Sequence, residues 1–285
     1  MNLSGTYARA NYKHLMLIPL AILLLSVGVL VYTHQTTGEW FKRSVELRGG
    51  TEITVATGGP SDVSALQSAL EKRFGDASVR ELGGAGGRGL LVSVGDVDPR
   101  DVVGVIKEST DVIDFSYQRV GPALGESFWK QSRLAFITAF FFMAVVVFLA
   151  FRTFVPSVAV IQAAVTDVLA TLAAMQLLNI EMSLFTFGAV MLIIGYSVDT
   201  DILLTTRMLR RDGDLIERIM SSVKTGLTMT ATALVALLAL YATASTPALR
   251  DFSMVLIVAL LADVPATYFM NAGLLRMWLE RRNSR

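Results

Sequence analysis

Residues 182–206 have the sequence MSLFTFGAVMLIIGYSVDTDILLTT, an apolar stretch that contains two aspartates, Asp199 and Asp201. A helix needs about 20 predominantly apolar residues to cross a bilayer, and this stretch is long enough. Five more runs of the same character occupy residues 15–33, 134–151, 155–178, 223–244 and 252–275. Six transmembrane helices therefore decide the fold.

The average composition combines two kinds of sequence, apolar helices and a more polar segment. The 285 residues are 53% hydrophobic and 17% charged, whereas ordinary soluble domains have about 25% charged residues. Residues 34–133 hold 14 of the 24 acidic residues and 15 of the 22 glycines. We therefore predict four parts: residues 1–33 with the first helix, a water-soluble domain at 34–133, five helices at 134–275, and a basic tail at 276–285.

Lysine and arginine predict the orientation, because they concentrate in short cytoplasmic loops. The first apolar run is interpreted as a retained anchor, since it is longer than the core of a signal peptide and no cleavage site follows it. The multi-pass chain is then expected in the cytoplasmic membrane with both termini inside and the domain at 34–133 outside. Arg250 alone lies in a short outer loop; the basic residues of the inner segments are Arg9, Lys13, Arg152, Arg207, Arg210, Arg211, Arg218, Lys224, Arg276, Arg281, Arg282 and Arg285.

The segment between the first two helices changes to short alternating patterns. Strands are predicted at 52–57, 78–82, 90–94 and 112–117, with a helix at 62–74 and another that begins at Pro99. Ser61 and Asp98 are the expected helix N-caps. The glycine-rich residues 83–87 predict a flexible loop rather than a tight hairpin turn. The order strand, helix, strand, strand, helix, strand is typical of a ferredoxin-like α+β domain.

Several function classes are excluded by residues that the chain lacks or holds in small number. The net charge of +1 does not favour nucleic-acid binding. Zero cysteines and two separated histidines argue against a metal site. The glycine-rich segment lacks the spacing of a phosphate-binding loop, so no nucleotide and no other cofactor is expected.

The four aspartates inside the apolar runs are the candidate functional residues. Asp167, Asp199, Asp201 and Asp263 lie near the expected middle of the bilayer, and the helix cores contain no lysine or arginine. Membrane carboxyls of this kind usually serve ion or proton pathways. The alternative is that they only bond neighbouring helices, through threonines such as Thr166, Thr225, Thr228, Thr230 and Thr232. Pro265, two residues after Asp263, marks either a kink or a cavity.

The two aspartates of residues 182–206 cannot face the same way, because positions two apart on a helix point in different directions. Ser197, Asp201 and Thr205 form a polar stripe at intervals of four. Asp199 instead shares a face with Gly188 and Gly195, whose small size permits close helix approach. We take Asp199 as the first candidate for ion transport and Asp201 as its rival.

Three motifs resemble those of the SecD/SecF protein-export family. The segment VELRGGTEI at 45–53, with Arg48, Gly49 and Gly50, resembles the Gly-Gly motif that follows the first helix of that family. VGPALG at 120–125, with Gly121 and Pro122, is similar to its Val-Gly-Pro segment. GYSVDTD at 195–201 resembles the fourth-helix motif of the SecF branch, with Gly195, Tyr196 and the basic residue Arg207 that closes the helix.

This resemblance implies a membrane subunit without enzymatic activity and with half of an RND-type helix bundle. It further implies work with SecD and the Sec channel on an unfolded secretory polypeptide, within membrane lipid, driven by the proton motive force. Two departures from the usual motifs of the family resemble an archaeal type of SecF. Thr200 occupies the position of the usual SecF acid while Asp199 aligns with the SecD acid, and Thr166-Asp167 replaces a His-Asp pair.

Three other functions are alternatives to protein export. An RND-type exporter of small molecules or lipids would share the architecture and is the main alternative. An intramembrane aspartyl protease would need Gly-x-Gly-Asp and Tyr-Asp motifs, which this sequence lacks. A purely structural scaffold would need no titrating carboxyl.

Overall fold

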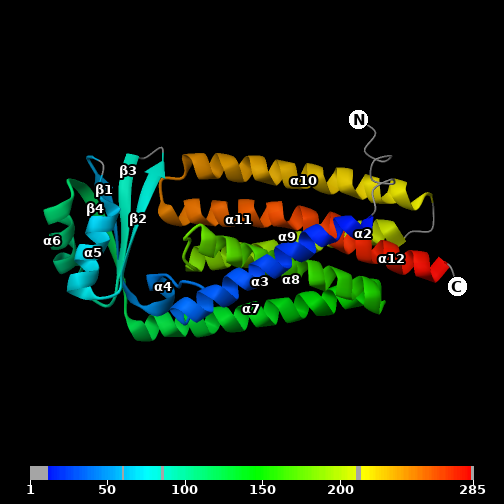
Figure 1. The fold of residues 1–285 in the computed structure, drawn as a ribbon, viewed down its shortest axis with the longest axis horizontal. Helices are drawn as coiled ribbons and strands as arrows, with labels where there is room; N and C mark the ends of the chain where they lie inside the picture. Colours follow the sequence, from blue (N-terminus) through cyan, green and yellow to red (C-terminus); the bar gives the residue numbers. More distant parts are fainter. Residues whose placement is uncertain (1–11, 60, 85–86, 210–212, 284–285) are drawn as a thin grey trace.

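A computed structural model describes residues 12–59, 61–84, 87–209 and 213–283. Long helices run side by side, and a small α+β domain lies at one end of the bundle (Figure 1). Arg9, Arg210, Arg211 and Arg285, which entered the orientation argument, lie outside the described residues.

Six helices of the described chain are long and apolar enough to cross a membrane, which confirms the six predicted spans. The structure extends most of them beyond the apolar runs, since a helix continues past the hydrocarbon region. The spans are α2 and α3 (Tyr12–Leu15 and Leu17–Thr37), α7 (Pro122–Phe151), α8 (Phe154–Leu177), α9 (Leu184–Leu209), α10 (Leu215–Thr243), and the continuous α11, η1 and α12 (Pro247–Pro265, Ala266–Asn271 and Ala272–Asn283).

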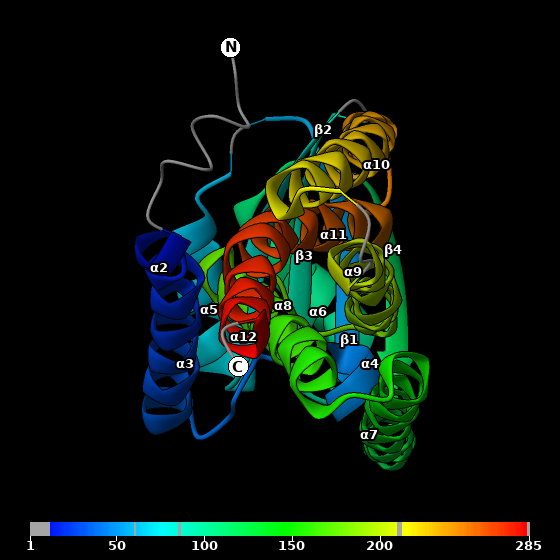
Figure 2. The same ribbon diagram turned by 90° about the vertical axis from the view of Figure 1, so that its right-hand side faces the viewer.

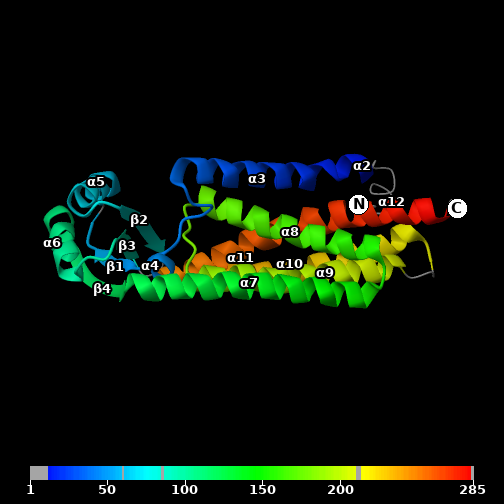
Figure 3. The ribbon, with the colours of Figure 1, turned by 90° about the horizontal axis from the view of Figure 1, so that it is seen from below.

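The spans divide into three central and three peripheral helices. In α8, α9 and the α11 span, half or more of the most apolar window is buried, whereas in α3, α7 and α10 no more than 17% is. Figure 2 looks along the bundle and shows α10 and α7 on opposite sides of α9. In Figure 3, α7 runs from the α+β domain along most of the bundle, and α12 extends beyond it. The peripheral helices present apolar side chains such as Leu24, Phe141 and Val235 outward, as expected of surfaces that face lipid.

The α+β domain has the predicted element order. Its elements are β1 (Gly50–Thr57), α5 (Val63–Phe74), β2 (Ala77–Gly84), β3 (Gly87–Val94), α6 (Pro99–Ser109) and β4 (Val112–Val120), preceded by the short α4 (Val45–Arg48). The strands form one antiparallel sheet in the order β2-β3-β1-β4. This confirms the ferredoxin-like fold.

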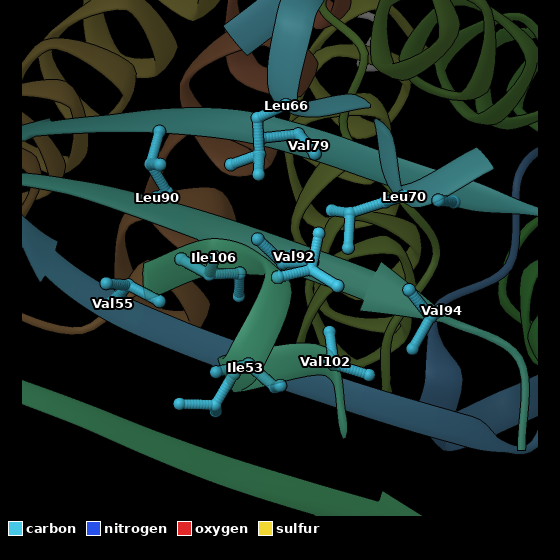
Figure 4. Packing of buried hydrophobic residues seen from close by; sticks show 13 residues of the cluster. Ile53, Val55, Leu66, Leu70, Val79, Leu90, Val92, Val94, Val102 and Ile106 are labelled. Carbon is cyan, nitrogen blue, oxygen red and sulfur yellow. The ribbon is translucent and has the colours of Figure 1, made fainter. Parts of the chain in front are cut away.

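The two helices cover one face of the sheet. Ile53 and Val55 of β1 point to that face, as their alternation predicts, and meet Leu66 and Leu70 of α5 and Ile106 of α6 (Figure 4). All five side chains are buried. Glu52, which alternates with them, therefore lies on the opposite face of the sheet.

Two local predictions in this domain were wrong. The N-cap of α5 is Asp62, whose carboxylate accepts from the Ala65 amide at 3.0 Å, and the Ser61 hydroxyl has no partner among the described residues. Asp62 is one residue closer to the helix, so its side chain reaches the first free amides. The predicted loop at 83–87 is shorter, because Gly83 and Gly84 continue the ladder with residues 88 and 87.

The two glycine motifs of the sequence meet where the chain enters and leaves the domain. Gly49 and Gly50 have φ angles of +83° and +135°, which favour glycine. A Cβ on Gly49 would lie 2.5 Å from the Cα of Pro122, and one on Gly125 would lie 2.4 Å from the Gly49 nitrogen. The motifs are therefore explained by a close approach of α4 and the start of α7, which fixes the domain on the bundle.

Candidate functional site

Three of the four predicted aspartates lie inside the bundle, one on each central helix. Asp167 belongs to α8, Asp201 to α9 and Asp263 to α11, and each side chain is at most 1% exposed. Tertiary packing thus brings together carboxyls that are far apart in the sequence. The candidate site, called here the carboxyl cluster, consists of Asp167, Asp201 and Asp263.

Hydroxyl groups connect two members of the cluster. The Ser197 hydroxyl donates to Oδ2 of Asp167 at 2.5 Å. One turn along α9, the Thr200 hydroxyl donates to the Ser197 carbonyl oxygen at 2.8 Å and lies 3.3 Å from Oδ2 of Asp263. Hydroxyl groups of α9 therefore contact a carboxyl on α8 and another on α11.

The third carboxyl has its own partner on the α11 span. Asn271 donates its amide to Oδ1 of Asp201 at 2.7 Å, and Thr267 donates its hydroxyl to Oδ1 of Asp263 at 3.1 Å. Thr267 and Asn271 both belong to η1, the π-helical segment that follows Pro265. The wider π turn is common at functional sites and here turns both side chains to the cluster. Pro265 thus marks more than a simple kink.

The carboxyl cluster is polar but incompletely bonded. Oδ1 of Asp167 and Oδ2 of Asp201 are buried and have no hydrogen-bond partner among the described residues. The salt bridges among the described residues involve other side chains and none of the three aspartates of the cluster. A carboxylate buried in this way without a cation is costly in its charged form. The arrangement therefore suits groups that gain and lose protons.

The threonines expected to bond the carboxyls mostly do not. Thr166, Thr225, Thr228 and Thr232 donate to carbonyl oxygens of their own helices, and Thr230 lies 3.4 Å from the Tyr196 hydroxyl. Thr200, Thr267 and Asn271 contact the cluster but were not among the predicted site residues. Their signal is polarity at spacings of four along an apolar helix, which places Asp263, Thr267 and Asn271 on one face.

Asp199 faces away from the cluster. Its side chain is exposed on α9, two residues from the fully buried Asp201, which confirms that the two aspartates point in different directions. The exposed stripe of α9 also contains Gly188 and Gly195, and a Cβ added at either glycine would meet nothing within 4 Å. The buried stripe is Ser197, Asp201 and Thr205, each 0% exposed.

The remaining motif residues connect α9 to α10. Arg207 donates to the Ser221 carbonyl oxygen at 2.6 Å and to the Ser221 and Thr225 hydroxyls at 3.0 Å. Arg207 therefore anchors the end of α9, away from the α+β domain. Near the domain, Arg48 pairs with Asp76 at 2.6 Å.

A second group of charges lies where the sheet meets the helices. Arg80 of β2 pairs with Asp251 of α11 through two contacts, 2.6 and 3.3 Å long. Glu181, in the α8–α9 loop, and Glu52 of β1 lie near them. Burial raises the pKa of Glu181. Burial, together with the charges of Glu181 and Glu46, raises the pKa of Glu52 to about 7.

The Glu52 carboxyl makes stability depend on pH. Its pKa is about 7 in the folded chain and 4.5 ordinarily, so folding favours the protonated form. The stabilisation that the protonated Glu52 carboxyl contributes is fully present below pH 4.5 and is lost as pH rises through about 7. We expect the thermal unfolding temperature of the chain in detergent to fall over this range. The variant Glu52→Gln should flatten this part of the profile, and an unchanged profile would contradict the assignment to Glu52.

No group of three or more His, Cys, Asp or Glu side chains in the described part of the chain is arranged to hold a metal ion.

Comparison with known proteins identifies the family. Residues 103–281 match the family described as protein export membrane protein SecD/SecF, C-terminal. Over 275 residues the chain is 37% identical to the protein-export membrane protein SecF of Pyrococcus furiosus, covering 96% of this chain and 93% of that protein. The chain belongs to the SecF family. SecF of Methanocaldococcus jannaschii is also 37% identical, over 94% of this chain and 96% of the relative.

Solved structures share the fold. SecDF of Thermus thermophilus, a translocon-associated membrane protein, superposes with a TM-score of 0.75 at 22% identity, over 99% of this chain. The chain spans 39% of that longer protein. A heavy metal efflux pump superposes with a TM-score of 0.50 at 13% identity, over 82% of this chain and 36% of the pump. The half-bundle predicted for an RND-type architecture thus has counterparts in both.

Proposed function

We propose that this SecF-family chain acts with SecD to promote polypeptide export across the cytoplasmic membrane, driven by proton movement through the carboxyl cluster. The observation that carries the proposal is the presence of three buried carboxyls on three central helices without a buried cation among the described residues. A membrane protein of an export family has no structural need for such a cluster. Apolar side chains would pack the helices as well.

The proton path follows the hydrogen bonds. The Ser197 hydroxyl bonds Asp167, and the Thr200 hydroxyl lies beside Asp263. In this proposal water carries the proton between these two ends. The unpartnered oxygens of Asp167 and Asp201 are the positions where water or a proton would enter. One elementary charge that crosses 100 mV supplies about 2.3 kcal/mol. This energy source requires no nucleotide site.

Helix α11 supplies the mechanical connection. It carries Asp263 in the cluster and, at the domain end, Asp251, which pairs with Arg80 of the sheet. Twelve residues separate the two aspartates, about 18 Å of helix. A change at Asp263 that moves α11 is thereby passed to the α+β domain. In this proposal residues 34–133 face the exterior, and both termini face the cytoplasm.

The exposed stripe of α9 is proposed to contact SecD. Asp199 has no partner in the described chain, and a carboxyl exposed to hydrocarbon is costly. Gly188 and Gly195 leave room beside it for a neighbouring helix, which is how small residues act in membrane packing. The Sec channel and an unfolded secretory polypeptide are the further partners of the proposed complex.

The test is export in reconstituted vesicles that contain the Sec channel and SecD, with and without this chain. We expect an imposed proton gradient to stimulate polypeptide export only when the chain is present. Equal stimulation in its absence would contradict the proposal.

An RND-type exporter of small molecules remains the second candidate because the efflux pump shares the fold. Co-purification separates the two functions. A stable complex with SecD favours protein export, whereas gradient-driven efflux of a small ligand by the chain without SecD favours the alternative.

A further inference from the structure

A cavity of about 370 Å³ opens at the domain end of the membrane helices and has no role in the proton path. Its volume is within the range of about 300–1,000 Å³ that is typical of small-molecule sites. Trp40 and Phe41, from the segment between α3 and α4, line it together with Trp129, Arg133, Phe136 and Ile137 of α7. Leu172 of α8 and Val190 of α9 also line it.

The cavity crosses the boundary between headgroups and hydrocarbon. Along α7, charged side chains end at Arg133, and residues 134–151 are an unbroken apolar run. That run is about 27 Å long, close to the thickness of the hydrocarbon core. Trp129 and Arg133 therefore lie at headgroup level, whereas Phe136 and Ile137 lie one turn inside the hydrocarbon. Tryptophan is enriched at this level of a bilayer.

Two arginines lie at the polar end of the cavity. The Cζ of Arg43 lies 5.6 Å and the Cζ of Arg133 lies 5.2 Å from the centroid of the Trp129 ring. Arg43 is neutralised by Glu39. Arg133 has no hydrogen bond or salt bridge with any residue that the structure describes. Its guanidinium is thus available to an anion.

We propose that this cavity binds one hydrocarbon chain of an anionic membrane lipid, with the lipid phosphate on Arg133. The occupant is indicated by the charge of Arg133 above the hydrocarbon boundary and by the apolar wall below it. An anionic lipid has the same arrangement, with its charged phosphate at headgroup level and its hydrocarbon chain in the bilayer interior. Arginine is suited to phosphate because its planar fork donates two parallel hydrogen bonds.

The bound lipid would join helices from three parts of the chain. The cavity wall combines the segment after α3 with α7, α8 and α9. A chain seated among them connects the peripheral α7 to the central helices. This role is independent of the carboxyl cluster, so the proposal stands or falls separately from proton transport.

Tryptophan fluorescence tests the proposal directly. The chain has three tryptophans, and two of them, Trp40 and Trp129, line the cavity. In a Trp278→Phe background, the full chain is reconstituted in phosphatidylcholine vesicles with lipids brominated on the acyl chain, which quench tryptophan on contact. Brominated phosphatidylglycerol and brominated phosphatidylcholine are compared at equal mole fraction.

We expect the anionic lipid to bind with about fivefold preference, the contribution of one basic residue near an anionic headgroup. Arg133→Gln should abolish this preference, and Lys130→Gln, the matched loss of an exposed cation on α7 that does not line the cavity, should retain it. Val190→Phe, which fills the cavity, should reduce quenching by both lipids. Equal quenching by the two lipids in the parent chain overturns the proposal. A preference that survives both Arg133→Gln and Val190→Phe overturns it as well.

Discussion

Asp263→Asn is expected to abolish the stimulation of export by a proton gradient while export without the gradient stays normal. Oδ1 of Asp263 accepts from Thr267, and Oδ2 lies beside the Thr200 hydroxyl. Asparagine keeps the oxygen that accepts from Thr267, and its amide nitrogen, in place of Oδ2, can donate to the Thr200 hydroxyl. The variant should therefore fold and assemble. It removes only the proton that the carboxyl can hold, and a positioned proton-transfer group contributes about a hundredfold or more.

The hydroxyl path offers a matched comparison. Thr200→Val removes the hydroxyl that lies beside Asp263 and donates to the Ser197 carbonyl oxygen, with little change in shape, so we expect the stimulation to fall. Thr232→Val makes the same chemical change on α10, where the hydroxyl only donates to the Met229 carbonyl oxygen. That variant should behave as wild type. The measurement is export into vesicles with SecD and the Sec channel, with and without the gradient.

Asp199→Asn distinguishes the two possible routes. If Asp263→Asn keeps full stimulation and Asp199→Asn loses it while SecD still binds, the proton path runs along the outer stripe of α9. That result would contradict a path through the carboxyl cluster and support the first candidate of the sequence analysis.

The membrane fold was predictable because its signals are local. An apolar run long enough to cross the bilayer predicts a helix by itself, and all six runs became helices. The alternation of Ile53 and Val55 likewise predicted the buried face of β1. Helix ends were less predictable, since α7 begins at Pro122, outside the apolar run, where it lies close to Gly49.

The choice between Asp199 and Asp201 required the tertiary structure. Residue spacing correctly separated their directions, and the stripe of Ser197, Asp201 and Thr205 was visible in the sequence. The local sequence does not indicate which face of a central helix packs inside its own bundle and which face contacts another chain. Polar residues collect on the inner face here, because carboxyls on α8 and α11 provide polar surroundings.

The charges at the base of the sheet had no sequence signal at all. Glu52 alternates with core residues and would be read as a solvent-exposed position of a half-buried strand. The pKa of Glu52 is raised by burial and by the charges of Glu181 and Asp251, which are more than a hundred residues away in sequence. The Arg80–Asp251 pair has the same origin.

Gly195→Phe is expected to reduce the association with SecD by about tenfold or more without unfolding the chain. A Cβ at this position meets nothing within 4 Å, so the chain itself has room for the larger side chain. A partner helix that lies against Gly195 and Asp199 would leave no room for the phenylalanine side chain, and overpacking a close contact costs about 1–3 kcal/mol. The measurement is the amount of SecD that co-purifies with the tagged chain.

Gly28→Phe is the matched control, since Gly28 lies in the middle of α3 and is equally open. The same substitution there adds the same apolar surface on a peripheral helix away from α9, as Figure 2 shows. We expect SecD association to be unchanged. Loss of SecD in both variants would indicate a general effect of bulk, and retention of SecD in Gly195→Phe would place the partner elsewhere. Because Asp199 lies on the same stripe, a blocked partner would also leave that carboxyl facing lipid, so the effect should exceed that of steric bulk alone.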